Sequence, residues 1–535
     1  MKSPPNPTAI DRRAFIKTAA LAGAGLALSR AQGALAAGAA TPSANPQSAF
    51  RNPQSKRPNI LFITTDDLGL QLSCYGDPNI KTPNFDALAN SGVRFATAYV
   101  TQANCSPARA SLLTGLYPHT NGQIGLQNEG FSMPRDNTPP TLPTLLARAG
   151  YRTGLMGKLH VSPEPAFTFT DDIRKNFPPE KMRDVRAVAA GAGAFFRRDP
   201  GKPFFLYLNY ADPHKDQKVT PSIFPAQVNG IPEKPFKPGD IPPWPFQQVE
   251  SPKVLEHIAN YYNCAQRVDT GLGLLLDELK NSGHADDTIV VYIADHGPPF
   301  ARAKTSCYEA GLHEALLIRW PGVSKPGLVS AAMVSSVDIM PTLLEAAGVP
   351  LPKLQHGRTL RPLLQGDTTN KRAYLAAEFH AHGREYFAPT RAIRDDRYKL
   401  IHNPLSGRMP PKPNIDTDAA PAVALSHKYD GTPAQEAMRR LINPPPWELY
   451  DLQTDPNEFK NLADDPAYRD ILTRLQNALA QWQAETDDPY RDPAKIEATL
   501  ADFAKRNAAN APSAKTKKTG KTNKSPKSKP PPDEN

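Results

Sequence analysis

Three apolar runs along the chain end at polar residues that can carry chemistry. The run NILFITTDD, residues 59–67, has β-branched residues throughout and stops at two aspartates. FFLYLNY follows at 204–210, and TIVVYIADHG at 288–297 ends with Asp295, His296 and a glycine. Continuous apolar runs of this length are typical of strands buried on both faces of a parallel sheet. We therefore expect strands that present Asp66, Asp67 and Asp295 at their carboxyl ends.

Helical patterns separate these strands. The segment TLPTLLARAG at 141–150 and a longer stretch from about 253 to 281 both carry apolar residues at helical spacing. Strands that alternate with helices predict an α/β fold, with a large, mostly parallel sheet sandwiched by helices. Ligands of such sheets bind beyond the carboxyl ends of the strands, which is where the aspartates fall.

The pattern changes near residue 370 to shorter pieces. TRAIRDDRYKLIHN and PWELYDL resemble strands, and DILTRLQNALAQWQAE has helical periodicity. We expect a small antiparallel sheet packed with one helix. The predicted organisation is a catalytic α/β domain at 57–369, a C-terminal α+β subdomain at 370–495, and a disordered tail at 505–535 that is rich in lysine and proline.

The N-terminus has the layout of an export signal. Arg12 and Arg13 are adjacent, and an apolar run and an Ala-rich stretch follow them. This arrangement predicts a twin-arginine signal peptide at 1–37, then a linker at 38–56, and hence a periplasmic or secreted protein. No later run approaches the about 20 apolar residues of a membrane span, so we expect no stable membrane anchor.

Charge and cysteine content narrow the function further. The formal net charge is +10, but much of it lies in the stretch KTKKTGKTNKSPKSKPPP near the C-terminus. Because no folded segment interleaves basic and aromatic residues, nucleic-acid binding is not expected. The chain has 4 cysteines, Cys74, Cys105, Cys264 and Cys307, too few for a disulfide framework, although one bridge is possible.

The segment CSPARASLLTG begins at Cys105 and is the most informative part of the chain. Pro107 suits the first turn of a helix, so Cys105 should lie at a helix N-terminus. That position favours anions and lowers the pKa of a thiol. The alternative is that Cys105 is a small buried apolar residue, which is the usual role of a single cysteine.

This segment resembles the signature of the type I sulfatases, a family of the alkaline-phosphatase-like superfamily. Cys105, Pro107, Arg109 and the Leu-Thr-Gly ending fall at the matching positions. The resemblance implies that a formylglycine-generating enzyme oxidises Cys105 to formylglycine. The hydrated aldehyde then offers two hydroxyls on one carbon: one attacks sulfur, and the other expels the sulfate.

The strand-end residues fit the metal site of that family. Aspartate oxygens suit Ca²⁺, with Mg²⁺ as an alternative. The resemblance implies a ligand set of Asp66, Asp67, Asp295, His296 and the modified Cys105, with His296 where many members have asparagine. Without the resemblance, an Asp-Asp pair at a strand end is equally well explained as a turn or a helix cap.

The resemblance also assigns roles to cations and histidines. Lys158 and Lys304 would bind the sulfate, His160 would hold and deprotonate the formylglycine hydroxyl, His214 would protonate the leaving group, and Arg109 would steady the modified residue. Each of these residues alone would more often be a solvated lysine or a hydrogen-bonded core histidine.

Among the sulfatases, the heparan N-sulfatase (sulfamidase) group has the most similar segments, such as GKLHVSPE and KPFFLYLNYADPHK. This implies a sulfated saccharide substrate of glycosaminoglycan type, with an N-sulfate or an O-sulfate. His296 and Lys304 depart from that group, which has Asn and Arg there. Two alternatives are a phosphomonoester or phosphonate hydrolase, which would need a second metal shell, and an inactive protein that binds anionic glycans.

Overall fold

The computed structural model describes residues 57–510 except 179–180, 220–221, 370 and 409–417. The predicted signal peptide at 1–37, the linker at 38–56 and the tail from 511 onward lie outside these residues. None of the described helices has the length and apolar character needed to cross a membrane. None of the four cysteines, all of which lie among the described residues, forms a disulfide, so the single bridge that the sequence allowed is not formed.

A mixed nine-stranded sheet forms the centre of the larger domain, in the order β4-β3-β5-β1-β6-β7-β2-β8 with β9 beside β2. The strands β3, β5, β1 and β6 are parallel, and β7 is antiparallel to both of its neighbours. Every residue of β1 is buried, as its unbroken apolar run predicts. The bounds are β1 Asn59–Asp66, β2 Val93–Tyr99, β3 Arg152–Gly157, β4 Asp171–Asp172, β5 Phe204–Pro213, β6 Thr288–Ala294, β7 His313–Arg319, β8 Leu328–Ser330 and β9 Val334–Ser335.

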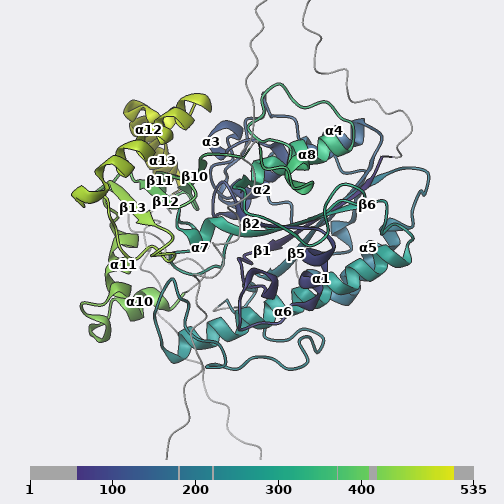
Figure 1. Ribbon diagram of the computed structural model, residues 1–535, viewed down its shortest axis with the longest axis horizontal. Helices are drawn as coiled ribbons and strands as arrows, with labels where there is room; N and C mark the ends of the chain where they lie inside the picture. Colours follow the sequence, from purple (N-terminus) through teal and green to yellow (C-terminus); the bar gives the residue numbers. More distant parts are fainter. Residues whose placement is uncertain (1–56, 179–180, 220–221, 370, 409–417, 511–535) are drawn as a thin grey trace, which may run out of the picture. The chain divides into compact units, whose positions relative to one another are not determined.

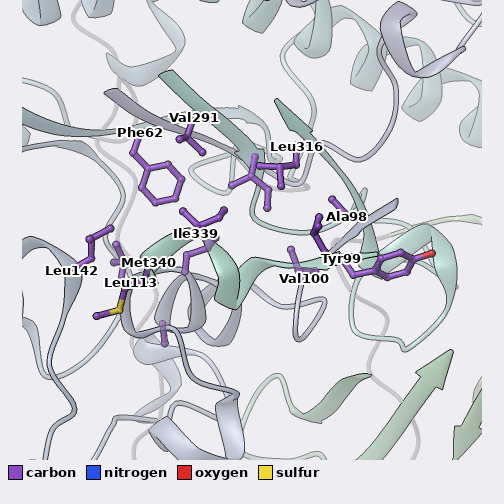
Figure 2. Close-up of a cluster of buried hydrophobic side chains, with 14 of the residues drawn as sticks. Phe62, Ala98, Tyr99, Val100, Leu113, Leu142, Val291, Leu316, Ile339 and Met340 are labelled. Atoms are coloured by element: carbon purple, nitrogen blue, oxygen red, sulfur yellow. The ribbon is translucent and has the colours of Figure 1, made fainter. Parts of the chain in front are cut away.

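Helices cover both faces of this sheet (Figure 1). One face carries α1 Pro83–Ser91, α5 Val185–Phe196 and α6 Pro252–Asn281, and the other carries α2 Cys105–Thr114, α4 Leu142–Arg148 and α8 Ile339–Ala346. Figure 2 shows the core on the second face, where Phe62 of β1 lies near Leu113, Leu142 and Ile339 from the three helices. Short helices lie at α3 Pro118–Asn121, α7 Glu309–Leu312 and α9 Arg361–Leu364. The predicted α/β sandwich is confirmed.

The C-terminal subdomain contains a four-stranded antiparallel sheet in the order β10-β11-β12-β13. Its strands are β10 Leu375–Ala381, β11 Phe387–Arg394, β12 Tyr398–His402 and β13 Trp447–Asp451. The sequence predicted one helix here, and the structure has α10 Ala420–Ala424, α11 Pro433–Ile442, α12 Arg469–Glu485 and α13 Pro493–Asn510. Helix α13 crosses the predicted boundary at 495 and includes residues 505–510, which we had assigned to the disordered tail.

Buried ion pairs join the two parts. Glu309 of α7 accepts hydrogen bonds from Lys399 at 2.9 Å and from Arg394 at 3.1 Å, and both cations belong to the C-terminal sheet. Lys399 also lies 2.9 Å from Glu458. Because these groups are almost entirely buried, removal of one partner would leave an uncompensated charge in the interface.

Candidate active site

Three aspartates meet at one edge of the large sheet. β1 ends at Asp66, Asp67 follows, and Asp295 comes directly after the neighbouring parallel strand β6. The backbone N–H of Asp295 donates to the carbonyl of Thr65 at 3.1 Å, and the N–H of Asp67 donates to Asp295 Oδ1 at 3.1 Å. All three carboxylates are buried. The strand-end positions expected from the apolar runs therefore bring these side chains together.

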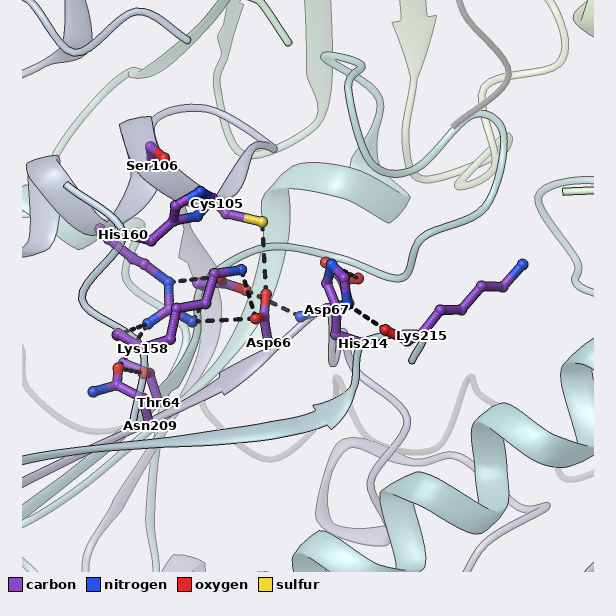
Figure 3. A network of polar contacts seen from close by, with 12 residues as sticks. Thr64, Asp66, Asp67, Cys105, Ser106, Lys158, His160, Asn209, His214 and Lys215 are labelled. Carbon is purple, nitrogen blue, oxygen red and sulfur yellow. Dashed lines mark hydrogen bonds and ion pairs between the residues drawn. The ribbon is translucent and has the colours of Figure 1, made fainter. Parts of the chain in front are cut away.

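Cys105 is the first residue of α2 and lies against the same aspartates (Figure 3). Its Sγ is 3.6 Å from Asp66 Oδ1 and 3.3 Å from His296 Nε2, and the residue is 2% exposed. Burial raises the pKa of this thiol far above its usual range, against the opposing charges of Lys158 and Lys304. Desolvation therefore opposes the lowering of the thiol pKa that a position at a helix N-terminus favours.

Each aspartate is paired with a cation. The contacts are Lys158 Nζ with Asp66 Oδ2 at 2.7 Å, Lys304 Nζ with Asp67 Oδ1 at 2.9 Å, and Arg109 Nε with Asp295 Oδ2 at 3.0 Å. Burial favours a raised pKa for Asp66, but the charges of Lys158 and His214 hold it well below its usual range. The predicted sulfate-binding lysines thus lie within reach of Cys105 and balance the acidic charge of the site.

Arg109 is fully buried and supports Asp295 at Oδ2, on the side away from Cys105's neighbours Asp67 and His296. Its Nη2 is 2.9 Å from Asp295 Oδ2, and its Nη1 donates to Asn209 Oδ1 at 2.7 Å and to the carbonyl of Lys158 at 3.0 Å. The planar guanidinium contacts three elements at once, which suits a rigid support. Asn209 lies on β5 and also accepts a hydrogen bond from Thr64. Sequence reasoning missed Asn209, because an asparagine inside an apolar run has no motif.

Two histidines turn the same nitrogen toward the aspartates. His296 Nδ1 donates to the carbonyl of Gly297 at 2.9 Å, and its Nε2 lies 3.3 Å from Asp67 Oδ1. His214 Nδ1 donates to the carbonyl of Lys215 at 2.8 Å, and its Nε2 lies 3.9 Å from Asp67 Oδ2. A backbone carbonyl on Nδ1 fixes the tautomer and leaves Nε2 available to a cation or a proton.

Backbone strain marks two of the predicted residues. Asp67 has φ 72° and His160 has φ 55°, which is the left-handed region that non-glycine residues rarely occupy. Such conformations persist where the surrounding structure enforces them, and they cluster at functional sites. Burial, together with the charge of Lys158, lowers the pKa of His160 to about 2, so its imidazole is neutral at physiological pH.

The ligand types match a divalent cation. Asp66, Asp67, Cys105 and His296 each offer an atom within 4.8 Å of all the others, and no other such group of acidic, thiol or imidazole side chains occurs among the described residues. Two carboxylates supply the hard oxygens that divalent cations prefer. Asp295 is not part of this group; its Oδ2 accepts a hydrogen bond from Arg109, and its Oδ1 accepts one from the N–H of Asp67.

Buried carboxylates with flanking lysines and histidines at the strand ends of an α/β sheet are typical of a hydrolase that acts on a tetrahedral anion. A family model described as Sulfatase matches residues 58–349, and one described as N-sulphoglucosamine sulphohydrolase, C-terminal, matches 302–407 and 437–485. The chain is 32% identical to human N-sulphoglucosamine sulphohydrolase over 81% of its own length and 91% of that protein. It therefore belongs to the sulfatase family and is a sulfuric ester hydrolase.

Solved structures support the fold. A protein solved in complex with its substrate D-glucosamine-2-N,6-O-disulfate is 23% identical, with a TM-score of 0.58 over 81% of this chain and 99% of that chain. A phosphonate monoester hydrolase from Silicibacter pomeroyi is also 23% identical, with a TM-score of 0.58 over 80% of this chain and 96% of that chain. Since two different activities share this fold, fold likeness leaves the substrate to the residues of the site.

Proposed function

We propose that the protein removes N-sulfate or O-sulfate groups from glucosamine-containing saccharides of glycosaminoglycan type, with Cys105 matured to formylglycine. One observation carries the proposal: Cys105 lies at the start of α2, between Asp66 and His296, within the CSPAR segment. The saccharide class is supported by the 32% identity to human N-sulphoglucosamine sulphohydrolase and by the C-terminal match to the same group.

The positions of the side chains suggest a separate role for each in the reaction. Lys158 and Lys304 present ammonium groups beside Cys105, where they would bind the sulfate oxygens of the substrate. His214 holds a proton on Nδ1 against the Lys215 carbonyl, so its Nε2 faces the site and would deliver a proton to the leaving group. Formylglycine would supply the hydroxyl nucleophile that a buried, protonated thiol lacks.

We further propose that the metal is Ca²⁺, with Mg²⁺ as the alternative, held by Asp66, Asp67, His296, the residue at 105 and Asp295. The cation would neutralise the sulfate charge and polarise the nucleophile. Asp295 would join the ligand set through Oδ1, which now accepts from the backbone of Asp67. Elemental analysis of protein purified without chelators tests this, and stoichiometric zinc in place of calcium or magnesium would overturn the assignment.

The competing activity is phosphonate or phosphomonoester hydrolysis. The phosphonate monoester hydrolase from Silicibacter pomeroyi, which has a similar fold, is an example of that activity. The single candidate ligand group in the described part of the chain favours sulfate, because we expect a phosphate or phosphonate hydrolase of this superfamily to need a second metal shell. Rates on 4-nitrophenyl sulfate and 4-nitrophenyl phosphate separate the two activities. A faster phosphate reaction by protein with mature Cys105 would reverse our preference.

Export is proposed from the sequence alone. The adjacent Arg12 and Arg13 support the twin-arginine route to the periplasm or beyond, and maturation by a formylglycine-generating enzyme would then precede export, since that route carries folded proteins. Cell fractionation of the wild type and of a variant with both arginines replaced by lysine tests the route. Unchanged export of the variant would count against it.

The experiment that tests the proposed function combines mass spectrometry with an assay. Peptides carrying Cys105 and Cys307 are compared in protein from the native host, where we expect formylglycine at 105 and a thiol at 307. The same protein should release sulfate from glucosamine-2-N,6-O-disulfate, and Cys105→Ala should not. A thiol at 105 in protein without activity would favour the inactive glycan-binding alternative.

A further inference from the structure

A short turn beside the active site, Gln127–Glu129, is fixed to two parts of the fold. The backbone N–H of Gln127 donates to Ser106 Oγ at 3.0 Å, next to Cys105 on α2. One residue earlier, the N–H of Leu126 donates to the carbonyl of His382 at 3.1 Å, and Arg384 donates to the carbonyl of Glu129. The loop between β10 and β11 and the helix of Cys105 therefore hold this turn in place.

The residues that follow leave the turn little freedom. Gly130 has φ 82°, and a Cβ at this position would lie 2.2 Å from the guanidinium of Arg384. The ring of Phe131 packs against Phe503 of α13, with ring centroids 5.7 Å apart. Because the turn is anchored on both sides, the side chain of Asn128 starts from a fixed backbone position.

Asn128 makes one directional contact with the predicted base. Its Oδ1 lies 2.8 Å from His160 Nε2. An amide oxygen only accepts hydrogen bonds, so Nε2 must carry the hydrogen, and the lone pair of the neutral ring is then on Nδ1. His160 Nδ1 is buried and has no hydrogen-bond partner among the described residues. The ring is thus held with a basic nitrogen that the protein itself does not use.

We propose that Asn128 is a positioning residue that locks His160 in the Nε2–H tautomer, so that Nδ1 receives the proton of the hydroxyl at position 105. This inference rests on the proposed function. The hydroxyl O–H bond breaks, its electron pair forms the carbonyl at residue 105, and the bond from that carbon to the sulfate oxygen breaks with its pair leaving on sulfate. The proton stays on Nδ1 until water removes it, while the Nε2–H group keeps its hydrogen bond to Asn128. In the other tautomer, Nδ1 would carry a hydrogen and could accept nothing.

The test uses three variants of the full-length, matured protein. Asn128→Leu keeps the size of the side chain and removes the acceptor, and Asn128→Asp keeps an acceptor. Gln127→Ala is the control, since Gln127 is exposed and contacts Ser106 through its backbone N–H. With 4-nitrophenyl sulfate and with glucosamine-2-N,6-O-disulfate, we expect Asn128→Leu to lower kcat by the factor by which the Nε2–H fraction falls, about three- to tenfold, with little change in KM. Asn128→Asp and Gln127→Ala should both stay within about twofold of the wild type.

A second measurement does not depend on activity. Long-range ¹H–¹⁵N spectra of ¹⁵N-histidine-labelled protein, assigned with His160→Gln, should show the Nε2–H tautomer in the wild type and in Asn128→Asp, and a mixture in Asn128→Leu. The inference is overturned by an Nδ1–H tautomer in the wild type, by equal losses in the Leu and Asp variants, or by an effect on KM for the saccharide alone. That last result would make Asn128 a saccharide contact. Absence of sulfate release by the wild type would instead count against the proposed function.

Discussion

Replacement of Arg109 by methionine tests the claim that this residue supports Asp295. Methionine fills the apolar part of the space but offers no donor. Asp295 therefore loses its two contacts with the guanidinium, at 3.0 and 2.9 Å, and Asn209 loses one. Breaking a fully buried pair by removing one partner costs about 3–5 kcal/mol. We expect Arg109→Met to lower the free energy of unfolding by about that amount at neutral pH, measured by urea titration followed by fluorescence.

The pH dependence makes the test specific. Burial already raises the pKa of Asp295 despite the charge of Arg109, and loss of that charge would raise it further. A carboxyl whose pKa is higher in the folded than in the unfolded protein stabilises the fold at low pH and loses that contribution as pH rises through the folded value. The deficit of Arg109→Met should therefore shrink as pH falls.

A matched control replaces an arginine that is paired at the surface. The side chains of Arg408 and Glu497 are 58% and 55% exposed, and Arg408→Met should leave unfolding unchanged. Equal unfolding midpoints for Arg109→Met and Arg408→Met, or a deficit that does not change with pH, would refute the argument that Arg109 is a buried structural cation.

Three further outcomes follow from the structure. Chelation with EDTA should lower the melting temperature of the wild type but not that of Asp67→Asn, and an equal fall in both would argue against Asp67 as a ligand. Burial raises the pKa of Glu458 to about 7 against the opposing charge of Lys399, so the wild type should lose stability as pH rises from about 4.5 through 7, and Glu458→Gln should flatten that profile in melts across pH. Phe503→Ala should loosen α13, seen as faster tryptic cleavage near residue 493 together with a lower kcat; cleavage at the wild-type rate would contradict the anchoring role of this ring.

Two different sequence signals predicted part of the site. Strand-end geometry placed Asp66, Asp67 and Asp295 together from hydrophobic pattern alone, because parallel strands end at one edge. The family resemblance supplied Lys158 and His160. Neither signal finds a residue such as Asn128, since its partner lies 32 positions away and the contact exists only after folding. The positive φ of Asp67 and His160 is likewise imposed by tertiary packing.

The fold was predicted where apolar runs are long and missed where they are short or mixed. β2 alternates between buried and half-buried positions, and β7 begins with His313 and Glu314, so neither matches the pattern of a fully buried strand. Helix α13 was missed although Ile496, Leu500 and Phe503 have helical spacing, because the rest of the stretch is polar and alanine-rich. These three residues lie on one side of the helix, and that side is the one that packs.

The burial of Cys105 limits the time in which another enzyme can modify it. A side chain that is 2% exposed in the folded protein is out of reach of another enzyme, so the proposed oxidation must take place before α2 is enclosed. His296, whose Nε2 lies 3.3 Å from Cys105 Sγ, is synthesised about 190 residues after Cys105, which at about 5–20 residues per second takes about 10–40 s. The burial of one residue thus gives the maturing enzyme a limited time, and slower translation would lengthen it.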